Sequence, residues 1–356
     1  MIIRTIHLLG LLSLFLMVGC TAIGPATIAR DRFEYSTAIA ESWKEMMLLN
    51  IVKLRYGDTP VFLEVGSIVN QYTLERELEG TAALKSGDLV GEGLELVGSG
   101  RYSDRPTITY SPIMGEKFSK SLLTPLPPHA LFMLIQSGWD SDFILRVCVS
   151  AINDLYNSSG KPQTIRRADD DFEQLLDHLS FIQQAGGLGA RLVERDGKRS
   201  LVYFKDQMDE DLEAHVAEVR RLLGLNPAAR EFRLVYGTTP SSDGELAVLT
   251  RSMLDIIAEL SQRVEVPHQH IEQHRASPGF SDKTPTTGEM RSRIRIRSSA
   301  DEPADAFLAV RYRTLWFSID DTDYRSKRMF SFLLFLLSLA EGGPQGMAPI
   351  LTLPAG

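Results

Sequence analysis

The first twenty residues constrain this chain more than any other stretch, because they predict where the chain folds. Arg4 precedes an apolar run at residues 8–18, and Gly19 then stands directly before Cys20. A basic start, a short apolar run and a small residue at the cleavage point are typical of a secretory signal peptide. The run covers eleven positions, whereas a membrane-spanning helix needs about 20. We therefore predict that residues 1–19 are a cleaved signal peptide.

The end of this segment, Met17-Val18-Gly19-Cys20, resembles the lipobox of bacterial lipoproteins, in which a small residue precedes the modified cysteine. The resemblance implies that Cys20 becomes the mature N-terminus and carries a diacylglycerol thioether, usually with a third acyl chain. Two or more long acyl chains anchor a protein stably, since each buried methylene contributes about 0.8 kcal/mol. Thr21 stands where an Asp would signal inner-membrane retention, so the resemblance implies the outer membrane, facing the periplasm. An unlipidated secreted protein and an uncleaved membrane anchor are the alternatives.

Cysteine usage and net charge limit the fold and its partners. The chain has two cysteines, and if Cys20 carries lipid, Cys148 has no partner within the chain for a disulfide. The fold must then hold by packing. Cys148 lies in the apolar stretch 143–149, which predicts a buried strand thiol rather than a nucleophile. The net charge of −8 becomes −9 when Arg4 is removed with the signal peptide, which argues against a nucleic-acid partner.

Hydrophobic periodicity predicts an α+β fold with mostly antiparallel sheet, in one body or in two lobes. Apolar residues at three- and four-residue spacing predict helices at residues 36–56, 130–136, 170–185, 212–223, 246–263 and 329–340. Alternating or short apolar runs predict strands at residues 61–65, 107–110, 191–194, 201–204, 231–236, 307–312 and 315–319. The last helix is apolar nearly throughout but spans only about 18 Å, too short for a bilayer, so we expect it in the core.

The same patterns divide the chain into consecutive segments. We expect a signal peptide at 1–19, a tether at 20–32, an N-terminal α+β lobe at 33–160, a central α+β region at 161–265, a polar loop at 266–290 and a C-terminal strand–hairpin–helix segment at 291–356. Within the first lobe, glycines punctuate residues 70–105 without matching a phosphate-binding fingerprint, so a flexible surface loop is expected there.

Three histidines form a candidate metal site in the sequence. His268, His270 and His274 stand in the polar loop in an H-x-H-x3-H arrangement. If the backbone is extended, two imidazoles one residue apart lie on the same side and could share zinc or copper. The sequence offers no convincing fourth ligand, and a solvated polar loop is the alternative. We predict no other cofactor.

A stripe of arginines opens the C-terminal segment. Arg291, Arg293, Arg295 and Arg297 alternate with serine and isoleucine, so a strand would place the four guanidinium groups on one face. Such a face could bind an anionic envelope ligand such as lipid head groups. Pairing with the chain's own Asp and Glu, or protection of a sheet edge, is the alternative.

The sequence contains no recognisable catalytic constellation. Residues 158–161 match S-x-x-K, but in a turn-like context and without the motifs that accompany it in serine acyltransferases. Neither G-x-S-x-G nor H-E-x-x-H occurs. Three aspartates at 320, 321 and 323 precede a predicted helix, where capping is their commonest role. We therefore assign no catalytic residue.

Two stretches, residues 41–60 and the C-terminal 310–313 through 326–328, resemble uncharacterised proteobacterial lipoproteins. The resemblance implies the same lipid-anchored location and carries no activity. Together with the anchor, it leads us to expect a non-enzymatic structural or assembly component of the envelope, with the membrane and other envelope proteins as partners. An envelope hydrolase acting on peptidoglycan or lipid, and a binding module using the arginine stripe, remain as alternatives.

Overall fold

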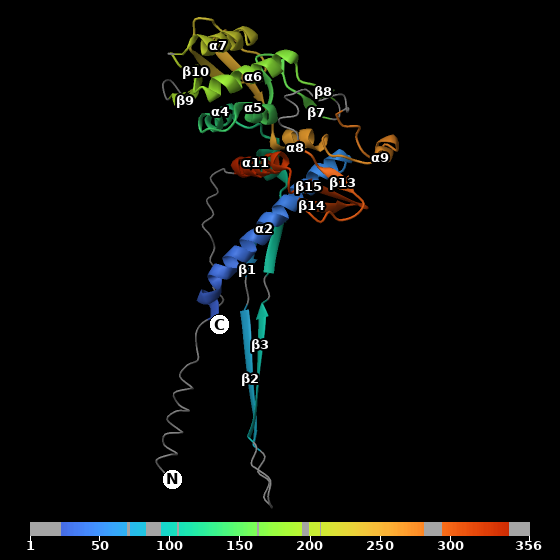
Figure 1. Cartoon of the computed structure of the whole chain (residues 1–356). Helices are drawn as coiled ribbons and strands as arrows, with labels where there is room; N and C mark the ends of the chain where they lie inside the picture. Colours follow the sequence, from blue (N-terminus) through green and yellow to red (C-terminus); the bar gives the residue numbers. More distant parts are fainter. Residues whose placement is uncertain are drawn as a thin grey trace, which may run out of the picture. The chain divides into compact units, whose positions relative to one another are not determined.

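The computed structural model describes residues 23–69, 72–82, 94–104, 107–161, 164–193, 199–206, 208–280 and 294–341. Its helices and mostly antiparallel sheets confirm the predicted α+β class (Figure 1). Contacts between Cα atoms divide the chain into two compact units. The first contains the described residues among 1–42 and 64–111, and the second those among 43–63 and 112–350. The units therefore interleave along the sequence, whereas sequence reasoning divides the chain into consecutive segments.

Helix α2, Ile23–Arg55, is longer than the helix predicted at residues 36–56. It begins within the segment 20–32, which was expected to be an irregular tether. The reason is that Pro25 falls in the first helical turn, where backbone N–H groups have no helical acceptor and proline is tolerated. Gly57 follows the helix with φ of +69°, the left-handed conformation expected of a C-terminal stop.

The end of α2 lies in the core of the second unit. Four apolar side chains there are fully buried: Met47, Leu48, Ile51 and Val52. Asn50 is also buried, at 1% exposure. Its Nδ2 donates to the Val61 carbonyl at 2.8 Å, and its Oδ1 accepts from the Val61 N–H at 2.9 Å. Asn50 thus fixes the chain that follows the helix, as the need of a buried amide for partners predicts.

The first unit contains a two-stranded ribbon where sequence reasoning expects a flexible loop. Strand β1, Leu63–Val69, pairs with β4, Thr107–Pro112, and β2, Tyr72–Ala82, pairs with β3, Leu94–Asp104. Figure 1 shows β2 and β3 running side by side. The loop prediction for 70–105 is therefore wrong over both strands. Glycine is a weak strand former, and Gly98 and Gly100, inside β3, conceal its alternation.

A six-stranded sheet organises the second unit, in the order β6-β5-β12-β11-β10-β9. Its strands are β5, Val149–Ile152, β6, Leu155–Tyr156, β9, Leu188–Val193, β10, Arg199–Phe204, β11, Glu231–Tyr236, and β12, Glu245–Thr250. Neighbouring strands are antiparallel except β11 and β12. The predicted hairpin around residues 196–197 is confirmed as β9 and β10.

Five helices accompany this sheet: α4, Pro128–Gln136, α5, Ser141–Cys148, α6, Asp170–Gln184, α7, Glu210–Leu222, and α8, Met253–Ser261. Helices α4 to α7 contact one another in sequence order, and α4 also contacts β9, β11 and β12. The amphipathic stripes of α6 and α7 are buried as predicted, with Phe172, Leu176 and Val216 fully covered.

Helix α5 replaces the strand predicted at 143–149. Asp140 caps it, its carboxylate accepting from the Phe143 N–H at 3.0 Å. All eight residues of α5 are buried, and periodicity alone does not distinguish a short buried helix from a buried strand. Cys148 is buried as predicted, but at the end of a helix.

The C-terminal part adds a small sheet and a helix. Strands β13, Arg297–Ser299, β14, Ala306–Tyr312, and β15, Leu315–Asp320, form a sheet in the order β13-β15-β14. Helix α11, Tyr324–Glu341, follows. Its side chains Phe330, Phe332 and Leu333 are buried at 1% exposure or less, so the apolar helix lies in the core as expected.

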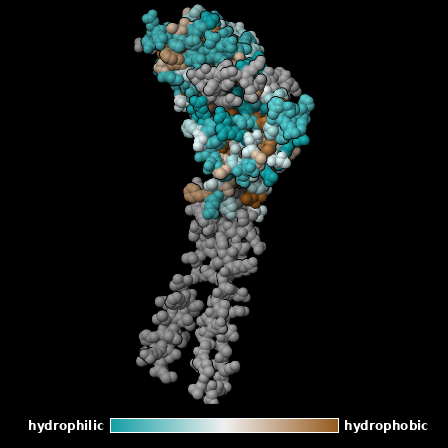
Figure 2. Space-filling model, turned by 45° about the vertical axis from the view of Figure 1, so that its right-hand side comes forward, coloured by the Kyte–Doolittle hydropathy of each residue, from teal (hydrophilic) through white to brown (hydrophobic). Residues whose placement is uncertain are grey.

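Shorter elements complete the described chain: helix α3, Gly115–Phe118, a π-helical turn at Ser119–Leu123, strands β7, Ser159–Lys161, and β8, Thr164–Arg166, and helix α9, His268–Glu272. The coloured part of the surface in Figure 2 is mostly hydrophilic, with apolar residues in small separate groups. Within the described ranges, none of the helices combines the length and the apolar character that crossing a bilayer requires.

Candidate functional site

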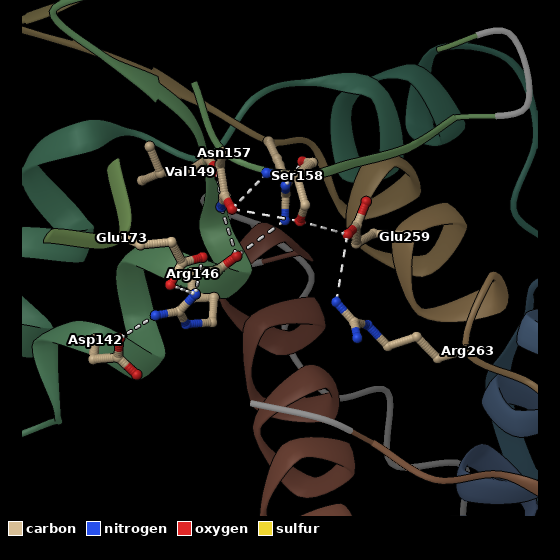
Figure 3. Close-up of polar contacts among 9 residues, drawn as sticks. Asp142, Arg146, Val149, Asn157, Ser158, Glu173, Glu259 and Arg263 are labelled. Atoms are coloured by element: carbon tan, nitrogen blue, oxygen red, sulfur yellow. Dashed lines mark hydrogen bonds and ion pairs between the residues drawn. The ribbon is translucent and has the colours of Figure 1, made fainter. Parts of the chain in front are cut away.

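A cluster of buried polar side chains joins α5, α6 and α8 in the second unit (Figure 3). Its centre is Arg146 on α5, which is 6% exposed. One guanidinium nitrogen, Nη1, donates to both carboxylate oxygens of Glu173 on α6, at 2.7 and 2.8 Å. The other, Nη2, donates to Asp142 one helical turn earlier, at 2.6 Å. Burial alone would lower the pKa of Arg146, but hydrogen bonds to the two carboxylates raise it above its ordinary value, so the charge is retained.

The second part of the cluster pairs a serine with a glutamate. Ser158 precedes β7 and donates from Oγ to Oε1 of Glu259 on α8 at 2.9 Å. Both residues are buried, at 8% and 7% exposure. Arg263 lies one turn further along, with Nη2 at 3.9 Å from the same carboxylate oxygen. Beside them, a Cβ at Gly160 would lie 2.9 Å from the Glu259 Cα, so only glycine allows this approach.

Arg251 is the third part of the cluster and binds backbone carbonyl groups. It is 4% exposed and follows β12 directly. Its Nη1 donates to the carbonyl oxygens of Arg146 and Val147, at 3.1 and 3.0 Å, and its Nη2 donates to the carbonyl of Ser158. These oxygens belong to the last turn of α5 and to the chain entering β7. A cation here also complements the negative end of the α5 dipole.

The buried cluster has groups that could be reactive, but it has no space for a substrate beside them. A hydroxyl hydrogen-bonded to a carboxylate can act as a nucleophile when a substrate reaches it. The cavity beside Ser158, Arg251 and Glu259 measures only about 20 Å³, which is room for about one water molecule. Arg146 therefore holds α5 to α6, the Ser158–Glu259 pair holds α8 to the chain before β7, and Arg251 links the end of α5 to that same chain.

A larger groove lies between the C-terminal ends of α4 and α6, with a volume of about 770 Å³. Trp139, Tyr203, Lys205 and Arg328 contribute aromatic and cationic groups to its lining. The amide of Gln183 is already committed, because its Nε2 donates to the carbonyl groups of Ile135 and Trp139 and its Oε1 accepts from the Ser141 N–H. The groove can admit a small polar molecule, while its best-placed amide serves to join α4, α5 and α6.

The three candidate metal ligands do not converge. Helix α9 covers His268 and His270, and successive helical residues are rotated by about 100°, so the shared side that an extended backbone would give is lost. His268 Nδ1 lies 3.1 Å from Glu272 Oε1, while His270 Nδ1 lies 2.9 Å from the Tyr56 hydroxyl. His274 follows the helix with φ of +55°. In the part of the chain that the structure describes, no three His, Cys, Asp or Glu side chains are grouped to hold a metal ion.

The structure describes half of the arginine stripe, since Arg291 and Arg293 lie outside the described residues. Arg295 and Arg297 are exposed and alternate with Ile294 and Ile296, which are fully buried. The predicted alternation is therefore confirmed over these four positions. Arg297 Nη1 lies 3.2 Å from the carboxylate of Asp320 on the neighbouring strand β15, which for this residue favours pairing within the chain.

Cys20 lies outside the described residues. Asp323 has the predicted capping role, because its Oδ1 accepts from the Ser326 N–H at 3.1 Å. Sequence reasoning missed Arg251, for which no local pattern exists, whereas Asp142 and Arg146 stand at the i,i+4 spacing that favours an ion pair.

The thiol of Cys148 is expected not to react in the folded protein. It is fully buried, and burial raises its pKa to about 12, so about one thiol in ten thousand would be ionised at pH 8. Incubation with a chromogenic disulfide reagent should modify no thiol under native conditions and one thiol of the lipidated chain in urea. Rapid modification of the folded protein would contradict this burial.

Two histidines missed by sequence reasoning form a contact between α6 and α7. His178 Nδ1 and His215 Nδ1 lie 2.7 Å apart, and the ring of Phe181 stacks on His215 with centroids 4.0 Å apart. One Nδ1 must donate and the other accept, so a second proton leaves the pair without an acceptor. Burial, and then the charge of His215, lower the pKa of His178, while Glu218 and Asp177 oppose this and Arg221 adds to it.

This pair predicts a loss of stability in mild acid. Because the pKa of His178 is lower in the folded chain, the unfolded chain binds more protons below about pH 6.5. The free energy of unfolding should therefore fall as pH decreases from about 6.5 to the lower folded-state pKa. Urea unfolding at several pH values should show a smaller slope for His178→Gln. A slope in His178→Gln equal to that of the wild type would refute the assignment.

No protein-family model, no curated protein and no solved structure matches this chain.

Proposed function

We propose that this chain is a lipid-anchored, periplasm-facing protein of the bacterial outer membrane, and that it acts there as a non-enzymatic structural or assembly component. The anchor is the predicted acylation of Cys20 at the end of the lipobox-like segment. Two or more acyl chains hold a protein stably at a bilayer, because each buried methylene contributes about 0.8 kcal/mol. The body that follows would then act close to the membrane surface.

The proposed structural role rests on the buried cluster, where the charged side chains bind other groups of the protein. Arg146 binds Asp142 within α5 and Glu173 on α6, and Ser158, before β7, donates to Glu259 on α8, so these groups serve to connect parts of the fold. An enzyme instead presents an acid, a base or a nucleophile to its substrate. The small volume beside the Ser158–Glu259 pair, about 20 Å³, supports the same conclusion.

Anchoring is tested by replacing the predicted acylation site. In a Gram-negative host, the wild-type chain should sediment with outer membranes, and Cys20→Ala should remove it from the membrane fraction. Intact-mass analysis of the wild type should show the added acyl groups on Cys20. Membrane association that survives in Cys20→Ala, without acyl mass on the wild type, would contradict the proposed anchor.

The non-enzymatic role needs a separate test against the hydrolase alternative. Extraction of the wild-type envelope in mild detergent should give defined envelope proteins that co-purify with this chain. Purified protein incubated with peptidoglycan should release no muropeptides. If the wild-type protein releases muropeptides and both Ser158→Ala and Glu259→Gln abolish that release, the serine–glutamate pair is a catalytic site and the proposal is overturned.

A further inference from the structure

The groove between the C-terminal ends of α4 and α6 has the size of a ligand site. Its volume is about 770 Å³, and small-molecule sites measure about 300–1,000 Å³. Residues of α4, α6, β9, β10 and α11 line it. These elements all belong to the second unit, so the groove is formed by one folded body and not by a single local segment.

The amide and serine side chains of the lining already have partners within the protein: Gln136, Ser137, Gln183 and Gln184. Gln136 Oε1, for example, accepts from the Ala190 N–H at 2.8 Å. Ser137 Oγ donates to the Leu134 carbonyl at 2.8 Å. These groups hold the walls of the groove together and leave ligand recognition to the other polar groups of the lining.

Four other side chains of the lining keep unused hydrogen-bond donors: Trp139, Tyr203, Lys205 and Arg328. Within the residues that the structure describes, the indole N–H of Trp139 and the hydroxyl of Tyr203 make no hydrogen bond. Over the same residues, the Lys205 ammonium and the Arg328 guanidinium make neither a hydrogen bond nor an ion pair. Ammonium and guanidinium groups have donors and no acceptor. The unused groups of the groove are therefore suited to an anion.

Tyr203 and Lys205 reach the groove from the end of β10. Tyr203 lies over Gly189 on the neighbouring strand β9, where a Cβ would overlap the tyrosine ring. Glycine at this position thus permits the ring to lie there. Lys205 Nζ lies 3.6 Å from the place that a Cβ of Gly186 would take, just beyond the end of α6.

Trp139 and Arg328 are joined by a cluster of aromatic rings. The rings of Trp139 and Phe143 both pack against Phe332 of α11, each with centroids 5.0 Å apart. Arg328 lies one turn earlier on α11, with its Cζ 4.8 Å from the centroid of the Phe143 ring, which is a cation–π contact. Packing within the protein therefore holds a cation and an aromatic ring at the groove before any ligand arrives.

The formal charge of the lining is positive. Asp140 is the one carboxylate among the lining residues, and its Oδ1 caps α5 by accepting from the Phe143 N–H at 3.0 Å. Lys205 and Arg328 outnumber it by two to one. A lysine beside a helix end can serve the helix dipole alone, but this does not account for Arg328, which comes from α11.

We propose that this groove binds a small acidic saccharide, with its carboxylate or phosphate bound by Lys205 and Arg328 and its sugar ring packed against Trp139 and Tyr203. The C–H groups of a sugar ring contact aromatic rings by dispersion and by burial of apolar surface. The choice of a saccharide rests on the proposed function, because a periplasm-facing protein would meet the amino sugars of peptidoglycan, some of which carry a carboxylate.

Isothermal titration calorimetry of the full-length protein, in micelles of a sugar-free detergent, tests the proposal with a matched set of ligands. N-acetylmuramic acid is N-acetylglucosamine with an added lactyl ether that carries a carboxylate. It should bind at one site, whereas N-acetylglucosamine and D-lactate should each bind at least about tenfold more weakly, because each lacks one half of the interaction. Equal affinity for the acid and for its neutral parent would overturn the role of the two cations.

A phosphorylated sugar distinguishes the two anions in the same titration. Tighter binding of N-acetylmuramic acid than of N-acetylglucosamine 1-phosphate would assign the groove to the carboxylate of peptidoglycan sugars. Tighter binding of the phosphate would assign it to a phosphorylated saccharide. Absence of binding by both acids would overturn the proposal.

Variants with opposite expected effects separate the groove from general damage. Lys205→Met and Arg328→Met should each weaken binding of the acid by about tenfold or more. Asp140→Asn should tighten it, because asparagine still caps α5 while the opposing charge is removed. Lys120→Met, at an exposed lysine outside the lining, is the control and should bind as the wild type does. Wild-type affinity in both methionine variants of the groove would overturn the proposal.

The sugar contact is read separately by tryptophan fluorescence. N-acetylmuramic acid should change the emission of the wild type, and Trp139→Phe, which keeps an aromatic ring, should remove that change. A change of the same size in Trp139→Phe would place the bound sugar elsewhere and overturn the assignment to this groove.

The failure of this inference can be distinguished from the failure of the proposed function. A chain with acyl mass on Cys20 that binds neither acid keeps its anchor and loses the saccharide site. A chain without acyl mass that binds the acid through Lys205 and Arg328 keeps the site and loses the anchor. Because N-acetylmuramic acid has no glycosidic bond, its binding is measured without any contribution from hydrolysis.

Discussion

Replacing Arg146 with methionine is expected to lower the free energy of unfolding of the full chain by about 3–5 kcal/mol. The change removes the cation that binds the carboxylates of Asp142 and Glu173, which are 9% and 20% exposed. Methionine fills much of the same space, so the loss comes mainly from two carboxylates left in a poorly hydrated site. Urea unfolding followed by circular dichroism and by tryptophan fluorescence measures the change.

An exposed ion pair provides the control for Arg146. Arg221 binds Glu218 within α7 at 2.6 Å, a similar distance, but its side chain is 64% exposed. Arg221→Met should therefore cost much less than Arg146→Met, because water and salt screen exposed pairs. Two variants with equal losses would show that burial of the Arg146 cluster contributes nothing beyond an ordinary surface contact.

Replacing Gly279 with alanine is expected to lower the free energy of unfolding by about 3 kcal/mol or more, for two reasons that add. Gly279 has φ of +70°, where an L side chain costs about 1–2 kcal/mol. A Cβ there would also overlap the guanidinium of the buried Arg55. That guanidinium cannot easily move, because it donates to Gln262 at 3.3 Å, to Ser277 at 3.1 Å and to the Pro278 carbonyl at 3.2 Å.

Gly224 separates the two contributions at Gly279. It has φ of +60°, and a Cβ there would meet nothing within 4 Å. Gly224→Ala should therefore lose only the backbone cost of about 1–2 kcal/mol. The difference between the two alanine variants reports the contact with Arg55, and no difference would mean that Arg55 moves aside freely.

Much of the fold could be predicted from the sequence wherever one side of an element is polar. Periodicity predicted four parts of the fold: the stripes of α6 and α7, the hairpin of β9 and β10, and the C-terminal hairpin. In each, solvent-facing residues alternate with core residues at the period of the element. The place of α11 in the core was predicted from length, since the twelve residues 329–340 are too few to span a bilayer.

The errors lie where that contrast is missing. Every residue of α5 is buried, and periodicity alone does not identify so short a segment as helix or strand. The cap at Asp140 and the i,i+4 spacing of Asp142 and Arg146 were the remaining signals. Glycines within β3 weakened the alternation of the ribbon. In α9, the spacing of His268 and His270 suggested a shared ligand only on an extended backbone, and the backbone there is helical.

The buried cluster was predictable in part. Asp142 and Arg146 stand four residues apart, a spacing that any helix converts into a contact. Glu173, Glu259 and Arg251 reach the cluster from other elements, and their separations of 27 to 105 residues from their partners carry no local pattern. Such contacts depend on tertiary packing, which one sequence does not reveal.

The hydrogen bonds of Arg251 have a consequence for local opening of the second unit. One buried side chain, at the end of β12, donates to carbonyl groups of the last turn of α5 and to the carbonyl group of Ser158 before β7. If either segment moves away, the buried guanidinium loses an acceptor, which costs free energy. The end of β12, the end of α5 and the chain before β7 should therefore open together rather than one at a time.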